Sequence, residues 1–154
     1  MPDLKQRLRG DLTASMKARD EVRTRTLRMA LAAITNEEVA GESARELSDD
    51  DVVKILTREA RRRREAASAF ETAGRSEQAA AEQAEEAVLA EYLPAQLDDA
   101  ELAALVAEAI ASTGAAGMGS MGAVMKAVTP KIARRADGGR VAAEVRRQLA
   151  GSAP

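Results

Sequence analysis

The residues best suited to do chemistry are cations near the carboxyl end of the sequence, and that chemistry is phosphate binding. The five cations are Lys126, Lys131, Arg134, Arg135 and Arg140. Gly119 and Gly122 precede them and allow close approach of a ligand to the backbone. The helix that we expect to start near Ser120 presents free N–H groups, which favour anions. The same cations are also consistent with an ordinary solvated helix face.

The charges are unevenly distributed along the chain. Residues 118–154 contain seven Lys or Arg and two acids, whereas residues 71–101 contain one Arg and nine acids, although the net charge of all 154 residues is −2. A basic end attracts phosphate even on a near-neutral protein. Aromatic residues make up 1% of the chain, so stacking on unpaired bases is not the main mechanism. RNA would then be bound through its backbone and shape.

A second class of function is a helical adaptor. Met118, Met121 and Met125 could form an adaptable apolar patch for a partner helix, or they could complete a small core. The salt dependence of binding distinguishes the two classes of function, because phosphate binding weakens steeply as the salt concentration rises and apolar docking does not.

Catalytic residues are not predicted. The chain has no Cys and no His, which removes thiolate nucleophiles and the commonest general base and metal ligand. Its serines lie outside a Gly-x-Ser-x-Gly setting, and the stretch GAAGMG follows no strand. We expect no catalytic residues, no metal and no cofactor.

The elements that must position these residues are helices, so the fold class is all-α. Apolar residues recur every three or four positions, Ala is abundant, and no strand pattern is present. We expect an amino-terminal domain of about four helices arranged in hairpins over residues 1–93. A three-helix domain follows over residues 98–150, and Pro94 marks the joint between the two.

Several helix ends and faces can be predicted from residue types. Ser48, Asp98 and Asp137 are suited to cap helix starts, Gly74 and Gly114 to end helices, and Pro130 to end the helix that carries the cations. Met16 continues the apolar spacing of the first helix. The third helix is expected to bury a face that includes Phe70. The fourth helix is expected to turn Ala81, Ala84, Val88 and Tyr92 inward.

The run RRRR, Arg61 to Arg64, must point to several sides of its helix, because successive residues lie about 100° apart. Arg63 falls on the apolar side, a heptad after Leu56, and a buried guanidinium needs a partner. If the third and fourth helices form a hairpin that turns near Gly74, Glu85 faces Arg63, with Glu59 as the local alternative. We therefore expect a structural ion pair of Arg63 with Glu85 or Glu59, and solvated side chains at Arg61, Arg62 and Arg64.

Four stretches together resemble the GatB/YqeY family: LRMALAAITNEEV, REARRRREAASAFETAGR, EYLPAQLDDAEL and MGAVMKAVTPKIARRADGGRV. The resemblance implies an all-helical fold whose carboxyl-terminal part is similar to the tail of the B subunit of aminoacyl-tRNA amidotransferases. That tail is understood to help hold the tRNA body and carries no catalytic site. The family therefore implies a tRNA-associated or amidotransferase-associated binding module. Possible partners are tRNA and components of an amidotransferase or an aminoacyl-tRNA synthetase. A glutamine-dependent carbon–nitrogen ligase activity is implied by the family name alone.

No apolar run approaches the length that spans a bilayer, and the first residues, MPDLKQRLRGDL, lack an apolar signal region. We expect a cytoplasmic protein without a membrane partner.

Overall fold

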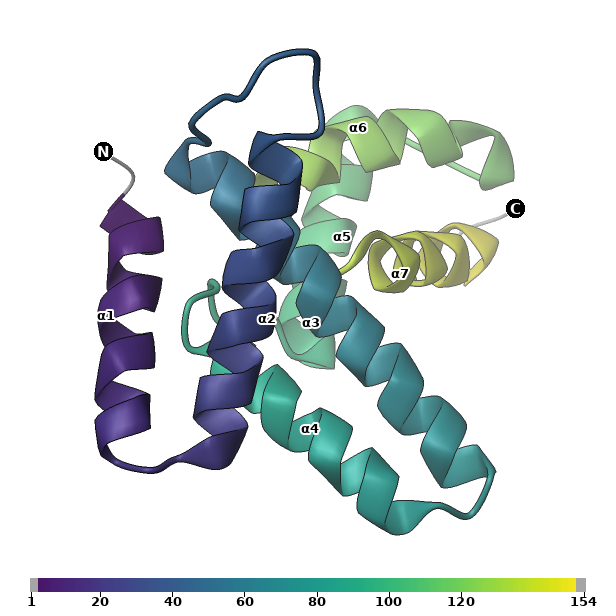
Figure 1. Ribbon diagram of the computed structural model, residues 1–154. Coiled ribbons are helices and arrows are strands. Elements are labelled where there is room, and N and C mark those ends of the chain that lie inside the picture. Colours follow the sequence, from purple (N-terminus) through teal and green to yellow (C-terminus); the bar gives the residue numbers. More distant parts are fainter. Residues whose placement is uncertain (1–2, 152–154) are drawn as a thin grey trace. The chain divides into compact units, whose positions relative to one another are not determined.

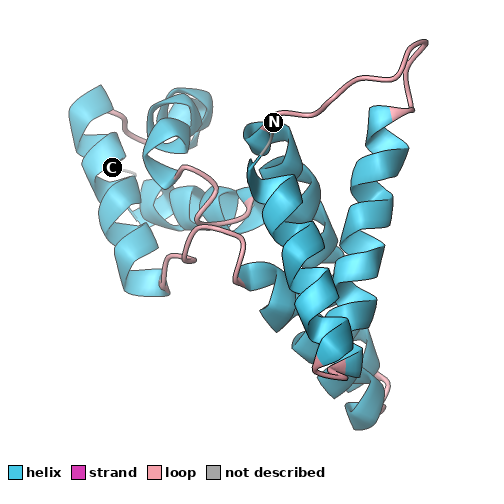
Figure 2. Cartoon of the chain, turned by 60° about the vertical axis from the view of Figure 1, so that its left-hand side comes forward, coloured by secondary structure: helices cyan, strands magenta, loops and turns pink. Residues whose placement is uncertain are grey.

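A computed structural model describes residues 3–151, and the helices within that range are connected by loops without any strand (Figures 1 and 2). The all-α prediction is confirmed. The elements are α1 (Asp3–Lys17), α2 (Glu21–Glu38), α3 (Asp49–Thr72), α4 (Ser76–Ala90), α5 (Asp99–Thr113), a 3₁₀ turn η1 (Met118–Ser120), α6 (Met121–Ile132) and α7 (Gly138–Gly151). The chain forms two compact units, one ending at Leu93 and the other beginning at Pro94.

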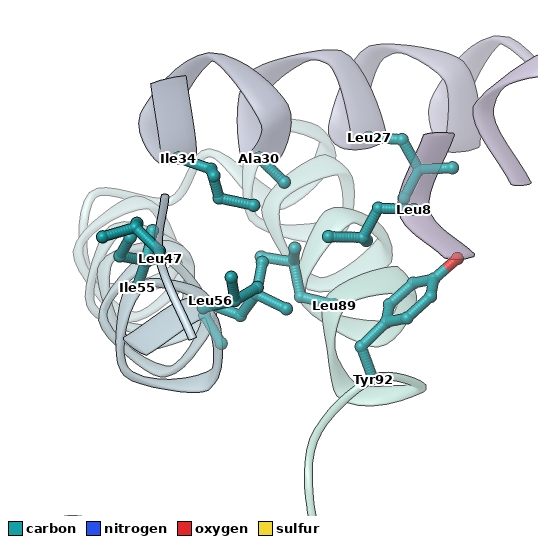
Figure 3. Close-up of a cluster of buried hydrophobic side chains, with 11 residues drawn as sticks. Leu8, Leu27, Ala30, Ile34, Leu47, Ile55, Leu56, Leu89 and Tyr92 are labelled. Atoms are coloured by element: carbon teal, nitrogen blue, oxygen red, sulfur yellow. The ribbon is translucent and has the colours of Figure 1, made fainter. Parts of the chain in front are cut away.

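The first unit packs α1 to α4 around a core of aliphatic side chains, part of which is shown in Figure 3. Each helix contributes residues at three- or four-residue spacing, which places them on one face. Leu8 of α1, Leu27 of α2, Leu56 of α3 and Leu89 of α4 are at most 1% exposed. Because the chain has so few aromatic residues, these leucines and their neighbours supply most of the apolar burial.

The second unit packs α5, α6 and α7 around its own core. Its fully buried side chains come from all three helices: Val106, Val124, Val128, Val145 and Leu149. Among the described residues, no single helix is both long and apolar enough to cross a membrane. Asp99–Thr113 and Met118–Ile132 pass that test only as a pair, by length and composition, with a bend of 93° between them.

Each of the five predicted caps lies at a helix end. The Ser48 side chain accepts a hydrogen bond from Asp51 N at 3.2 Å, and Asp98 forms a complete capping box with Glu101. Asp137 accepts from Arg140 N at 2.9 Å at the start of α7. Gly74 and Gly114 have φ of 74° and 65°, a conformation that costs little only for glycine. These interactions satisfy backbone groups that helix ends leave unpaired.

Pro130 does not end α6, contrary to the prediction. The helix continues to Ile132 and ends where Ala133 adopts a left-handed conformation, with φ 48°. The Pro130 ring removes only one backbone donor, close to the end of a helix whose buried residues Val124, Val128 and Ile132 span both sides of the proline. Packing of this apolar face therefore outweighs the local cost.

The predicted inward faces of α1 and α4 are partly wrong. Met16 is 43% exposed, although Leu8 on the same helix is buried. On α4, Ala81 and Ala84 are exposed, whereas Ala79, Glu85 and Leu89 are buried and Val88 is half-buried. Alanine buries little apolar area, so it does not determine which side of α4 faces the core.

A matched pair of valines tests the core assignment. Val52 of α3 is fully buried, whereas Val39, just after α2, is 59% exposed. Val52→Ala removes apolar volume from a packed site and leaves a cavity, so we expect a loss of about 2 kcal/mol in the free energy of unfolding. Val39→Ala should change it by less than about 0.5 kcal/mol. Urea unfolding followed by circular dichroism measures both, and equal losses would contradict the assignment.

Candidate nucleic-acid interface

The residues predicted to bind phosphate do not all lie together. Gly119 lies in η1 and Gly122 in the first turn of α6, whereas Lys131 lies in its last turn. Gly122 and Lys131 are thus about 14 Å apart along the helix, at 1.5 Å per residue. Lys126 is exposed but is turned about 140° from Lys131 around the axis. The predicted residues therefore do not form a single basic face beside the start of α6, because Lys126 lies one turn from Gly122 whereas Lys131 lies near the other end of the helix.

Four of the five predicted cations lie instead around the junction of α6 and α7. We call them the junction cations: Lys131, Arg134, Arg135 and Arg140. Lys131 belongs to the last turn of α6, and Arg140 to the first turn of α7. Arg134 has φ of 65° in the short connection between them. The break between the two helices therefore concentrates cations that a continuous helix would distribute around its axis.

Arg135 has a structural role at this junction. Its Nη2 donates to Lys131 O at 2.8 Å and its Nε donates to Ile132 O at 3.1 Å. The guanidinium thereby satisfies carbonyl groups that the end of α6 leaves unpaired, where a positive charge also suits the helix dipole. Its guanidinium is therefore already engaged at the end of α6.

Lys131 and Arg140 form ion pairs that are open to solvent. Lys131 Nζ lies 3.0 Å from Glu108 Oε1, and Arg140 Nη2 lies 3.1 Å from Asp99 Oδ1. The side chains of Glu108 and Asp99 are 64% and fully exposed, respectively. Such surface pairs contribute little to stability. A phosphate group could therefore replace either carboxylate at low cost.

Of the two alternatives for the methionines, the small core holds for two of the three. Met121 and Met125 pack against the core of the second unit, and only Met118 is largely exposed, at 48%. Exposed methionines occur instead in the first unit, where Met16 and Met29 line an open groove of about 750 Å³. Arg19, Arg25 and Arg28 also line it. No regular spacing in the sequence indicated this groove, because Met16 and Met29 belong to different helices.

Arg63 is buried between α3 and α4, with both expected glutamates against its guanidinium. Its Nη1 donates to Glu59 Oε2 at 2.9 Å, and its Nε lies 3.5 Å from Glu85 Oε2. All three residues are at most 8% exposed. Arg25 of α2 also donates to Glu85, at 2.9 Å, a contact that no pattern in the sequence indicated. We call Arg25, Glu59, Arg63 and Glu85 the buried ion network.

The other three arginines of the run are not equivalent. The side chains of Arg61 and Arg62 are 55% and 64% exposed, as expected, although Arg62 Nη1 also donates to Glu59 Oε1 at 3.3 Å. Arg64 was expected to be solvated, but its Nε donates to Glu86 of α4 at 2.8 Å and its side chain is 40% exposed. It pairs because Arg64 and Glu86 lie on sides of α3 and α4 that face each other.

Substitutions in the run test the buried ion network. Arg63→Ala leaves Glu59 and Glu85 buried without their shared partner, so we expect a loss of about 3–5 kcal/mol in the free energy of unfolding. Arg61→Ala removes an exposed cation of the same type and should cost less than about 1 kcal/mol. Urea unfolding of both variants measures the difference. A loss for Arg63→Ala as small as that for Arg61→Ala would show that Glu59 and Glu85 do not need Arg63 to compensate their buried charges.

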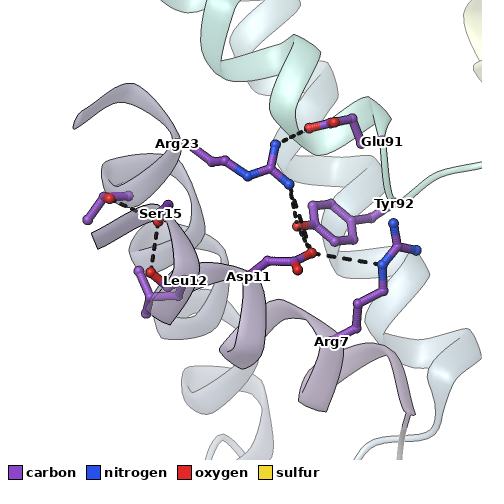
Figure 4. A network of polar contacts seen from close by, with 8 residues as sticks. Arg7, Asp11, Leu12, Ser15, Arg23, Glu91 and Tyr92 are labelled. Atoms are coloured by element: carbon purple, nitrogen blue, oxygen red, sulfur yellow. Dashed lines mark hydrogen bonds and ion pairs between the residues drawn. The ribbon is translucent and has the colours of Figure 1, made fainter. Parts of the chain in front are cut away.

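A second polar network lies where α1, α2 and the end of α4 meet (Figure 4). The Tyr92 hydroxyl donates to Asp11 Oδ2 at 2.5 Å and accepts from Arg23 Nη2 at 3.1 Å. Arg23 also binds Glu91, and the guanidinium of Arg7 lies 4.7 Å from the centre of the Tyr92 ring. Burial, reinforced by the hydrogen bond to Asp11, raises the pKa of Tyr92 from 10.0 to about 12.

This raised pKa predicts a loss of stability in alkaline solution. Between pH 10 and about 12 the folded chain keeps the Tyr92 proton that the unfolded chain has lost. The contribution of Tyr92 is therefore fully present below pH 10, and it falls as pH rises towards 12, by roughly 2–3 kcal/mol. Tyr92→Phe should lack this component of the pH dependence of unfolding.

The ionisation can be observed directly, because Tyr92 is the sole tyrosine and the chain has no tryptophan. The ultraviolet absorbance of the phenolate therefore reports this residue alone. A midpoint near pH 10 in the folded protein would contradict the predicted shift.

Comparison with known proteins agrees with the resemblance in the sequence. The family model described as Yqey-like protein matches residues 5–149. No curated protein matches the chain significantly. Because the family match extends from α1 to the last turns of α7 and so includes both units, the chain belongs to the YqeY-like family.

Proposed function

We propose that this protein is a non-catalytic binding module for the phosphate backbone of RNA, with the body of a tRNA as its substrate class, acting in the cytoplasm. The observation that carries the proposal is the positive charge of residues 118–154, which contain seven Lys or Arg and two acidic residues. Phosphate contacts of this kind supply affinity without requiring base recognition.

The geometry of the α6–α7 junction supports this function better than base readout. Lys131 and Arg140 lie at a helix break and are held only by solvent-exposed carboxylates. The only aromatic side chains of the chain are Phe70 and Tyr92, both in the first unit, so the junction offers no surface for stacking on bases. Cations without stacking residues favour recognition of backbone and shape.

Association with an amidotransferase or an aminoacyl-tRNA synthetase would be a natural setting for such a module, because those enzymes act on tRNA. The family resemblance supports this association. A carbon–nitrogen ligase activity rests on the family name alone, and we do not include it in the proposal.

The methionine-lined groove of the first unit favours a second candidate function, that of a helical protein adaptor. Met16 and Met29 are 43% and 45% exposed there. Flexible thioether side chains adapt to different apolar partners. This function would be carried by a surface separate from the junction and would be largely insensitive to salt.

The RNA proposal is tested by neutralising two cations of the junction. Lys131→Gln combined with Arg134→Gln should lower the slope of log affinity for tRNA against log salt by somewhat under one unit per lost phosphate contact. Arg135 is left intact because it caps α6. Fluorescence anisotropy with labelled tRNA over a series of salt concentrations measures the slope.

The matched control is Arg9→Gln combined with Lys17→Gln, which removes the same charge from exposed positions of α1. The control should lower affinity only slightly through the change in net charge. A junction variant that behaves as the control does would contradict the proposed interface, and an unmodified protein without measurable tRNA binding would contradict the proposed function.

A further inference from the structure

The middle of α3 presents an exposed surface made only of cations. Between Val53 and Arg63, the exposed residues are Lys54, Arg58, Arg61 and Arg62. Their positions on the helix fall within about 100° of one another around the axis. Glu59, the one acid in this stretch, is 8% exposed and accepts hydrogen bonds from Arg63 and Arg62. The exposed Glu65, just beyond the stretch, lies 4.0 Å from Arg61. We call the four cations the α3 stripe.

The amino-terminal end of the α3 stripe borders a small hollow between α3 and the loop that precedes it. The hollow has a volume of about 170 Å³, and Arg45, Lys54 and Arg58 line it together with the acids Glu37 and Asp51. Arg45 comes from the loop, nine residues before Lys54. Three cations from two chain segments therefore converge on a space large enough for a small anionic group.

The ion pairs around the hollow are long. Arg45 lies 3.9 Å from Glu37 and 3.8 Å from Asp51, and Lys54 lies 3.9 Å from Asp51. In the part of the chain that the structure describes, Arg58 forms no ion pair. Contacts at these distances between exposed side chains contribute little. Shorter charge-assisted hydrogen bonds to a phosphate would be stronger.

The surroundings of the hollow favour a phosphate chain over other anions. Arg61 and Arg62 continue the stripe along the helix. At a rise of 1.5 Å per residue, Arg62 lies about 12 Å from Lys54. A single phosphate group cannot span that distance. None of the exposed positions from 54 to 62 is apolar, so a protein partner would find no side chain to bury as an anchor. A polyanionic backbone matches both the length and the composition of the stripe.

We propose that the hollow and the α3 stripe form a second RNA contact, in which Arg45, Lys54 and Arg58 hold one backbone phosphate and Arg61 and Arg62 hold the next part of the same strand. This inference rests on the proposed function, because it assigns a further surface to the same ligand. Each unit of the chain then carries its own phosphate-binding surface, and binding through both raises the overall affinity above that of either one alone.

The test compares three double variants in the tRNA anisotropy assay. Lys54→Gln with Arg58→Gln removes two cations of the hollow, and the junction variant and the α1 control are those described above. We expect the hollow variant to lower the salt slope by about 0.7–0.9 units for each lost contact, as the junction variant does, and the control to leave it unchanged. Circular dichroism establishes that all three variants are folded.

The outcomes separate this inference from the proposed function. A hollow variant that matches the control while the junction variant loses affinity overturns the inference and leaves the proposed function intact. If both variants match the control, both proposals are overturned. Titration with inorganic phosphate, followed by nuclear magnetic resonance of the Arg45, Lys54 and Arg58 amides, distinguishes binding of an RNA backbone from binding of free phosphate. Saturation by free phosphate at the concentrations at which tRNA binds would overturn the RNA assignment.

Discussion

The burial of one guanidinium, that of Arg63, couples α3 to α4 in the first unit. A charge removed from water is tolerated only where opposite charges and hydrogen-bond acceptors replace the solvent. Glu59 supplies one carboxylate from one turn earlier on α3, and Glu85 supplies another from α4. If α4 slid or rotated against α3, Arg63 would lose Glu85, and both charges would remain buried. Such networks add little net stability, but they make alternative registers costly.

The register set by Arg63 has consequences for the rest of the unit. In this register Arg64 lies against Glu86, and Arg25 of α2 forms an ion pair with Glu85. In the same orientation of α4, Leu89 faces the core and Tyr92, just after the helix, reaches Asp11 and Arg23. The same orientation of α3 directs Lys54, Arg58, Arg61 and Arg62 to solvent. One buried ion network thus relates the core, the Tyr92 network and the exposed cations.

The cations of this chain fall into two groups that differ in how they are held. Arg63 and Arg135 are enclosed by carboxylates or carbonyl groups at hydrogen-bond distance, and removing them would disturb the helices that they join or cap. Lys54 and Arg45 have carboxylates only at 3.8 Å or more, and Lys131 and Arg140 have partners that are open to water. Phosphate can compete only for the second group. Counting cations in the sequence does not distinguish the two groups, because distance and exposure define them.

Local features determined much of this protein independently of tertiary contacts. The all-α class, the caps at Ser48, Asp98 and Asp137, and the inward orientation of Arg63 follow from propensity, capping chemistry and helical spacing, which act within a few residues. Tertiary packing decided the rest. It left Ala81 and Ala84 of α4 exposed, carried α6 past Pro130, and brought Arg45 to Lys54 and Tyr92 to Asp11. These outcomes depend on burial and on charge pairs between distant segments, whose free energies are set by the neighbours that folding brings together and not by the residues adjacent in the chain.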